Sequence, residues 1–227
     1  QAQLDAVERD VAVLRECAVP YELLDRDQLA QVEPALAQAR DRLTGGLRLP
    51  KDETGDCHRF TNELARIATG LGVELRFNQN VDGLVVEGGR IAGVRVNGEL
   101  LTADRYVMAF GSYSRQALEP LGLDLPVYPV KGYSITVNLL DEQSQRAAPN
   151  VSLLDDETKL VTSRLGVDRF RVAGTAEFNG FNRDIRADRI KPLVDWVNQC
   201  FPGVSTRRVE PWAGLRPMMP DMLPRVG

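Results

Sequence analysis

The sequence predicts an α+β fold in which antiparallel sheets are combined with amphipathic helices. Apolar residues near the N-terminus recur three or four positions apart, a period that indicates helix. Between residues 83 and 102, short alternating stretches are separated by tight-turn residues, which is typical of an antiparallel meander. From residue 127 onward, longer alternating stretches indicate a larger antiparallel sheet.

The first 72 residues predict three helices. The first should end before Pro20, and its apolar stripe consists of Leu4, Val7, Val11 and Leu14. An extended segment at 21–24 leads to Asp25 or Asp27 as the N-cap of a brief second helix. After an extended segment at 47–50, the third helix carries the apolar stripe Phe60, Leu64, Ile67 and Leu71.

Residues 73–109 predict mainly strands. Residues 73–77 alternate, and the meander follows with strands at 83–87, 91–96 and 100–102. The turn Asn97-Gly98 favours the positive backbone angles that a tight hairpin requires. Residues 106–109 form a continuous apolar run, typical of a buried strand, that ends at Gly111.

The larger sheet is expected to use four stretches and a final strand. These are residues 127–137, 151–154, 159–164, 169–177 and 209–213. A helix with apolar residues between Ile185 and Val197 should precede the final strand and end before Pro202. The loop 141–150 is the most plausible flexible stretch.

The composition excludes several functional classes. The net charge of -4 arises from evenly scattered charges without a basic stripe, so nucleic acid is not an expected partner. The three cysteines, Cys17, Cys57 and Cys200, are odd in number and far apart, which fits reduced thiols. His58 is the single histidine and lies in the first turn of a helix, so neither a metal site nor a histidine-activated nucleophile is expected.

The location and completeness of the chain are also matters of expectation. No apolar run approaches the roughly 20 residues of a membrane span, and no signal segment is seen, so a cytoplasmic location is expected. The sequence begins at Gln1 without an initiator methionine and stops at Gly227 in the middle of a motif. We therefore expect it to be an internal piece of a longer protein.

Four phrases carry a resemblance to a known family. The stretch 104–112 places small residues at the end of a strand, where a backbone can approach a cofactor closely. It overlaps the second of four longer phrases, which are residues 45–57, 107–114, 127–134 and 212–221. These phrases resemble the flavin-carrying small subunit of bacterial D-amino-acid dehydrogenase, which belongs to the D-amino-acid oxidase superfamily. They occur in the same order as in that family, and the resemblance covers essentially the whole chain.

The resemblance implies part of a two-dinucleotide-binding FAD fold interrupted by a substrate domain with an antiparallel sheet. Residues 1–50 would be a helical segment associated with the substrate domain, and 51–118 a partial FAD-binding domain. Residues 119–211 would form the substrate domain, and 212–227 would return to the FAD domain and the substrate-site loop. The family's N-terminal Gly-x-Gly-x-x-Gly unit, which holds the pyrophosphate, is not found, nor is its C-terminal glycine-rich segment. We therefore expect FAD in the intact protein and weak or no FAD binding by this piece alone.

The resemblance also implies the reaction and the site. A hydride would pass from the α-carbon of a D-amino acid such as D-alanine to the flavin, giving a 2-oxo acid and ammonia after hydrolysis. Arg216 would bind the substrate carboxylate, because a guanidinium can donate two parallel hydrogen bonds to the two oxygens of a carboxylate. Tyr133 and Trp212 could line the pocket, although aromatic residues in strands more often belong to the core. Residues expected to touch the cofactor are Val81, Ala109, Phe110 and Gly111. No catalytic side chain is expected, because the flavin carries the difficult step.

Several alternatives stay open. Lys131, Lys159 and Glu177 are possible pocket residues, but a solvent-facing role is favoured for both lysines. The protein could instead be a glycine or sarcosine oxidase relative, or a folded module without catalysis. The electron acceptor could be oxygen or a membrane quinone. The resemblance implies peripheral association with the inner membrane, although no segment shows an anchoring amphipathic face.

Overall fold

The computed structural model describes residues 2–226 and confirms a mixed α+β fold with antiparallel sheets. The described chain forms two compact units. Unit 1 contains the described residues up to 56 together with 132–176 and 184–213, and unit 2 contains residues 57–131, 177–183 and the described residues from 214 onward. The four-part division expected from the sequence stays a prediction.

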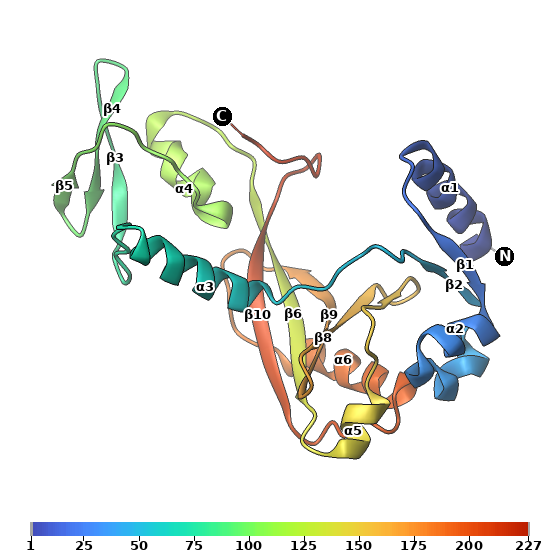
Figure 1. The fold of residues 1–227 in the computed structure, drawn as a ribbon. Coiled ribbons are helices and arrows are strands. Elements are labelled where there is room, and N and C mark those ends of the chain that lie inside the picture. Colours follow the sequence, from blue (N-terminus) through green and yellow to red (C-terminus); the bar gives the residue numbers. More distant parts are fainter. Residues whose placement is uncertain (1, 227) are drawn as a thin grey trace. The chain divides into compact units, whose positions relative to one another are not determined.

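Figure 1 labels the helices and strands along the chain. They divide between the two units as follows. Unit 1 contains α1 (Ala2–Glu16), β1 (Glu22–Asp25), α2 (Arg26–Val32), the 3₁₀ helix η1 (Pro34–Arg42), β2 (Gly45–Arg48), α5 (Glu142–Ala147), β7 (Leu154–Asp155), β8 (Leu160–Leu165) and α6 (Ala187–Cys200). Unit 2 contains α3 (Cys57–Gly70), β3 (Val81–Glu87), β4 (Arg90–Val96), β5 (Glu99–Leu101), η2 (Gly111–Tyr113), α4 (Ser114–Leu118) and η3 (Glu119–Leu121). Three strands have residues in both units, namely β6 (Tyr128–Asn138), β9 (Arg169–Phe178) and β10 (Val209–Met218).

The second helix begins after Asp25, one of the two N-caps that the sequence predicts. The Asp25 carboxylate accepts hydrogen bonds from the backbone N–H groups of Asp27 and Gln28, both at 2.9 Å. In return, the Gln28 side chain accepts from the Asp25 backbone N–H at 2.9 Å. This reciprocal capping box satisfies donors that the first helical turn leaves unpaired.

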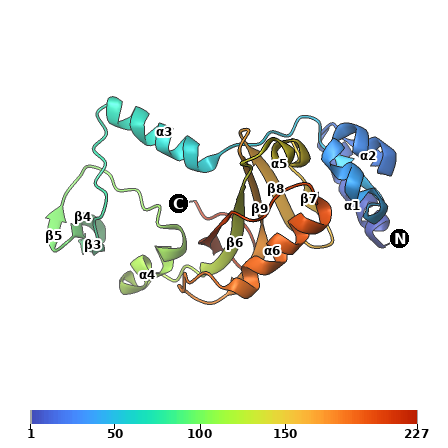
Figure 2. The same ribbon diagram turned by 90° about the horizontal axis from the view of Figure 1, so that it is seen from below.

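The main sheet has five strands in the order β10-β6-β9-β8-β7, and α6 lies along one face of it (Figure 2). Alternate residues of the strands point toward that helix and form the core of unit 1. Its fully buried members include Ile135, Val137, Phe170, Val172 and Leu193. The opposite face of the sheet therefore carries the intervening residues of each strand.

The alternation of β9 changes at Gly174. Phe170 and Val172 point into the core, yet the Thr175 hydroxyl also reaches the helix side and donates to the Arg189 carbonyl at 2.9 Å. A Cβ at Gly174 would lie 2.7 Å from the Lys159 carbonyl oxygen and 2.5 Å from a methyl group of Leu160. Only glycine fits this close approach of β9 to β8.

In unit 2, the predicted meander is confirmed as the sheet β3-β4-β5. Asn97 and Gly98, with φ of 49° and 83°, form the tight turn between β4 and β5. Within the described residues, no strand is present at 73–77 or at 106–109, so these two predictions are wrong. Apolar runs become strands only where a neighbouring strand pairs with them, and Val107 is instead 92% exposed.

Two further expectations need correction. The loop 141–150 contains α5, because the Asp141 carboxylate caps the backbone N–H of Ser144 at 2.7 Å and Ser144 is buried. The last strand extends to Met218, beyond the expected end at residue 213. Helix α3 is confirmed, but its apolar stripe is exposed, with Phe60 at 68%.

Candidate active site

The turn at Phe110–Tyr113 lies against the end of β10, and both segments belong to unit 2. Gly111 has φ +52°, a left-handed conformation that favours glycine, and opens η2. The buried Ser112 hydroxyl donates to the Leu215 carbonyl at 3.4 Å. A Cβ at Gly111 would lie 3.8 Å from Pro217 Cγ, which is ordinary contact. The turn is thus seated beside the strand segment that contains Arg216.

Arg216 occupies the middle of that segment and its side chain is exposed. Strand alternation directs it to the face of β10 opposite Leu215 and Pro217. Among the residues that the structure describes, no carboxylate lies within ion-pair distance of Arg216. Its guanidinium is therefore available for an external carboxylate, for which its planar donors are suited.

The residues before the turn fit a close backbone approach by a cofactor. Ala109 is exposed and Phe110 is half-buried. Neither Ala109 nor Gly111 carries a side chain beyond Cβ that would block the approach of a cofactor to the backbone at its own position. Val81 begins β3 opposite Val96 and is 40% exposed. The cofactor roles of these residues stay predictions.

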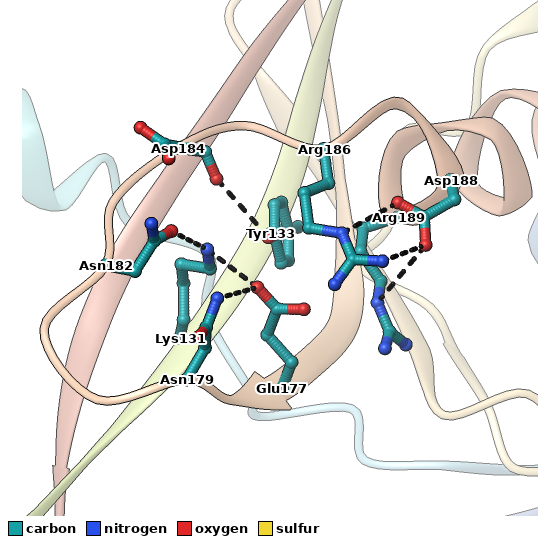
Figure 3. A network of polar contacts seen from close by, with 9 residues as sticks. All are labelled: Lys131, Tyr133, Glu177, Asn179, Asn182, Asp184, Arg186, Asp188 and Arg189. Atoms are coloured by element: carbon teal, nitrogen blue, oxygen red, sulfur yellow. Dashed lines mark hydrogen bonds and ion pairs between the residues drawn. The ribbon is translucent and has the colours of Figure 1, made fainter.

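The end of β9 and the loop that follows it, together residues 177–183 of unit 2, are fixed at two points. Phe181 stacks on Tyr113 of the turn, with ring centroids 5.1 Å apart. Lys131 Nζ lies 2.6 Å from Glu177 Oε1 and donates to Asn182 Oδ1 at 2.8 Å, and Asn179 donates to Glu177 at 3.4 Å (Figure 3). The contacts hold the loop beside the Gly111 turn.

The Lys131 side chain is fully buried, so the solvent-facing role expected for it is wrong. Its β6 register places it in line with the core residue Tyr133, where solvent cannot reach it. Lys159, by contrast, is confirmed as exposed and pairs with Asp156. The position of Lys131 inside an apolar strand could have indicated that the lysine is buried with a partner of opposite charge. The sequence did not show that this partner is Glu177.

Tyr133 lies in the core of unit 1 and is 1% exposed. Its hydroxyl donates to the Asp184 carbonyl at 3.5 Å, as Figure 3 shows. The side chain has almost no free surface for a ligand here, and its substrate role stays a prediction. Trp212, the other aromatic residue considered, is 56% exposed.

Within residues 2–226, no group of three or more histidine, cysteine or acidic side chains is arranged to hold a metal ion. No helix in the described part of the chain has the length and apolarity needed to cross a membrane.

Comparison with known proteins gives a family match over the whole sequence. The profile described as DAO, FAD dependent oxidoreductase, matches residues 1–227. Among solved structures, glycine oxidase from Geobacillus kaustophilus has a TM-score of 0.86 and 23% identity, covering 100% of this chain and 59% of that one. L-proline dehydrogenase from P. horikoshii has a TM-score of 0.85 and 16% identity, covering 100% of this chain and 60% of that one.

Iminodiacetate oxidase from Chelativorans sp. BNC1 has a TM-score of 0.77 and 23% identity, covering 96% of this chain and 57% of that one. At these identities the likeness shows a shared fold. The chain spans 57% to 60% of the length of these three proteins.

Proposed function

The chain belongs to the DAO family of FAD-dependent oxidoreductases, and from this premise we propose that the intact protein is a D-amino-acid dehydrogenase. It would oxidise D-amino acids such as D-alanine to 2-oxo acids and ammonia. The four phrases that resemble the D-amino-acid dehydrogenase small subunit support this substrate class. The observation that carries the proposal is the contact of the Gly111 turn with the β10 segment that contains Arg216, for which the described residues provide no carboxylate within ion-pair distance.

In this proposal, Arg216 binds the substrate carboxylate with two charge-assisted hydrogen bonds and fixes the orientation of the α-carbon. Val81, Ala109, Phe110 and Gly111 contact the cofactor through their backbone, and Tyr133 supports the pocket. FAD, when bound, supplies the hydride acceptor. The substrate must enter with a neutral amine, and water then hydrolyses the imino acid product.

The proposed acceptor of the electrons is a membrane quinone. The protein would then work in the bacterial cytoplasm, peripherally associated with the inner membrane. This part of the proposal rests on the resemblance of the four phrases alone. The competing acceptor is oxygen, as for a glycine or sarcosine oxidase relative, and the fold shared with glycine oxidase makes that the second candidate.

The proposal is tested by anaerobic visible spectra of the FAD-reconstituted intact protein with D-alanine, L-alanine, glycine or sarcosine. Bleaching by D-alanine, and not by the other three, supports it. Bleaching by glycine or sarcosine favours the second candidate, and no bleaching by any of the four overturns both. Reoxidation is then followed with air or with a soluble quinone, where rapid reoxidation only by quinone supports the dehydrogenase.

A further inference from the structure

The face of the main sheet opposite α6 carries a polar cluster within unit 1. Because core residues alternate with outward-facing ones, Ser134 of β6, Arg171 of β9 and Trp212 of β10 point to this face. The three strands are adjacent, in the order β10-β6-β9. The three side chains therefore form a row across the sheet.

Arg171 is held in place by the other two side chains. Its Nη2 donates to the Ser134 hydroxyl at 3.3 Å, and its guanidinium carbon lies 5.9 Å from the centroid of the Trp212 ring. Ser134 is 2% exposed, whereas Trp212 is 56% exposed and Arg171 is half-buried. The indole face stabilises the cation and fixes its orientation, while one side of the cluster stays open to solvent.

Arg171 differs from Arg169 and Arg164, which lie on the same and on the neighbouring strand, in its lack of an acceptor for most of its donors. Arg169, two residues earlier on β9, pairs with Asp56 at 3.0 Å. Arg164 of β8 donates to four backbone carbonyls at 2.7 to 3.3 Å. Within the described residues, no carboxylate lies within ion-pair distance of Arg171. A guanidinium has five N–H donors, so most of its donor capacity remains for a ligand.

We propose that Arg171, Ser134 and Trp212 form a carboxylate-binding subsite of unit 1. A single guanidinium fork matches the two oxygens of a carboxylate, whereas phosphate sites usually add further cations or a helix N-terminus. The indole beside the cation gives an apolar wall, so the ligand is a carboxylate attached to a hydrocarbon group. This inference goes beyond the proposed function, which assigns the substrate carboxylate to Arg216, and it holds whether or not the protein oxidises D-amino acids.

The test follows the indole N–H signal of Trp212 by NMR in the intact protein, assigned as the signal that Trp212→Phe removes. Butyrate and inorganic phosphate are titrated separately at constant ionic strength. Butyrate should shift the signal saturably, and Arg171→Met should weaken this binding about tenfold or more. The Trp196 indole, which donates to Asp155 at 2.7 Å, serves as an internal reference that should not shift.

Matched variants separate this subsite from other cations. Arg169→Met removes a charge from the same strand and Arg216→Met removes the proposed substrate residue, and both should retain butyrate binding. Arg171→Lys keeps the positive charge but lacks the two parallel N–H donors of a guanidinium, so it should bind butyrate more weakly than the parent. Unchanged binding in folded Arg171→Met protein, equal binding of phosphate, no shift at all, or loss of binding in Arg216→Met would each overturn the proposal.

Discussion

The ammonium nitrogen of Lys131 lies 2.6 Å from Oε1 of Glu177, and their side chains are 0% and 6% exposed. Lys131 also donates to Asn182, so the pair connects β6 to the loop 177–183. Burying two charges costs desolvation energy, which close contact and added hydrogen bonds offset. If one partner is removed, the other is left as an uncompensated buried charge.

We therefore expect Lys131→Met to lower the free energy of unfolding by about 3–5 kcal/mol. The double variant Lys131→Met with Glu177→Leu should be less destabilised than the single variant, because no charge then remains buried. Lys159→Met, which removes an exposed partner of Asp156, is the matched control and should change the value by at most about 1 kcal/mol. Denaturant unfolding measures all three, and equal losses for Lys131→Met and Lys159→Met would contradict the argument.

Arg216→Ala tests the proposed carboxylate contact. In the intact protein, KM for D-alanine should rise by about tenfold to a hundredfold, because a charge-assisted contact is lost. Bound FAD, measured from the visible spectrum, should stay at the parent level, since the proposal places Arg216 at the substrate carboxylate and not among the residues that contact the cofactor. Arg225→Ala, which breaks an exposed pair with Asp221, is the control. Unchanged KM, or loss of FAD together with activity, would remove Arg216 from the substrate site.

The parts of the fold that the sequence predicts well are those decided locally. The capping box of Asp25 and Gln28 and the Asn97-Gly98 turn depend on residues within a few positions of each other. The expected strand at 106–109 failed because a strand needs a partner that an apolar run does not specify. The same holds for Lys131, whose environment is decided by Glu177, a residue distant in sequence.

The candidate site was predicted in a similar, partial way. Gly111 and Arg216 were identified from the phrases that contain them, but not the bond from Ser112 to the Leu215 carbonyl that joins their segments. The cluster of Arg171 and Trp212 was missed because strand order decides it: β9 and β10 both neighbour β6, although they are separated along the chain by α6. The alternation of apolar and polar residues indicates the face of the sheet to which each side chain points, but it does not indicate which strands are neighbours in the sheet.

Glu33 provides a second test of buried charge. Its carboxylate is 2% exposed and accepts from the backbone N–H groups of Ala35 at 3.1 Å, Asn150 at 2.7 Å and Val151 at 3.0 Å. Glu33→Gln keeps one acceptor oxygen but replaces the other with an NH₂ group that faces a backbone donor, and it should lower the free energy of unfolding by about 2–3 kcal/mol. Glu22→Gln, at an exposed pair with Arg48, is the control and should have little effect. Thermal or denaturant unfolding measures the free energy of unfolding of both variants. If Glu33→Gln leaves that free energy unchanged, the three hydrogen bonds to the carboxylate contribute little to stability.

The three thiols should differ in reactivity. Cys17 and Cys57 are exposed, whereas burial raises the pKa of the Cys200 thiol, against a smaller lowering effect of Arg42. A raised pKa reduces the thiolate fraction. A thiol reagent near neutral pH should therefore modify Cys200 at least about tenfold more slowly than Cys17 and Cys57. The Cys17→Ser, Cys57→Ser variant should show only this slow phase, and denaturant should make it fast. A fast phase in the folded double variant would contradict the burial of Cys200.

Asp155 gives a pH dependence whose sign follows from its contacts. Burial acts to raise the pKa of its carboxyl, but hydrogen bonds from the Trp196 indole at 2.7 Å, the Thr158 hydroxyl at 2.8 Å and the Glu157 backbone N–H at 3.0 Å outweigh it, and the net pKa is lowered. The folded carboxyl therefore binds a proton less readily than the unfolded one, whose pKa is about 3.9. Its stabilisation is complete above that value and is lost as the pH falls through the folded pKa.

Between about pH 6 and about pH 3, the free energy of unfolding of the parent should therefore fall more steeply than that of Asp155→Asn, which has no proton to bind at this position. Trp196→Phe removes the strongest of the lowering hydrogen bonds, so the pKa of Asp155, followed by NMR, should rise toward its usual value. The slope of the Trp196→Phe variant should lie between those of the parent and Asp155→Asn, even though its overall stability is lower. Parallel slopes in all three proteins would show that Asp155 is not the group through which acid destabilises this part of unit 1.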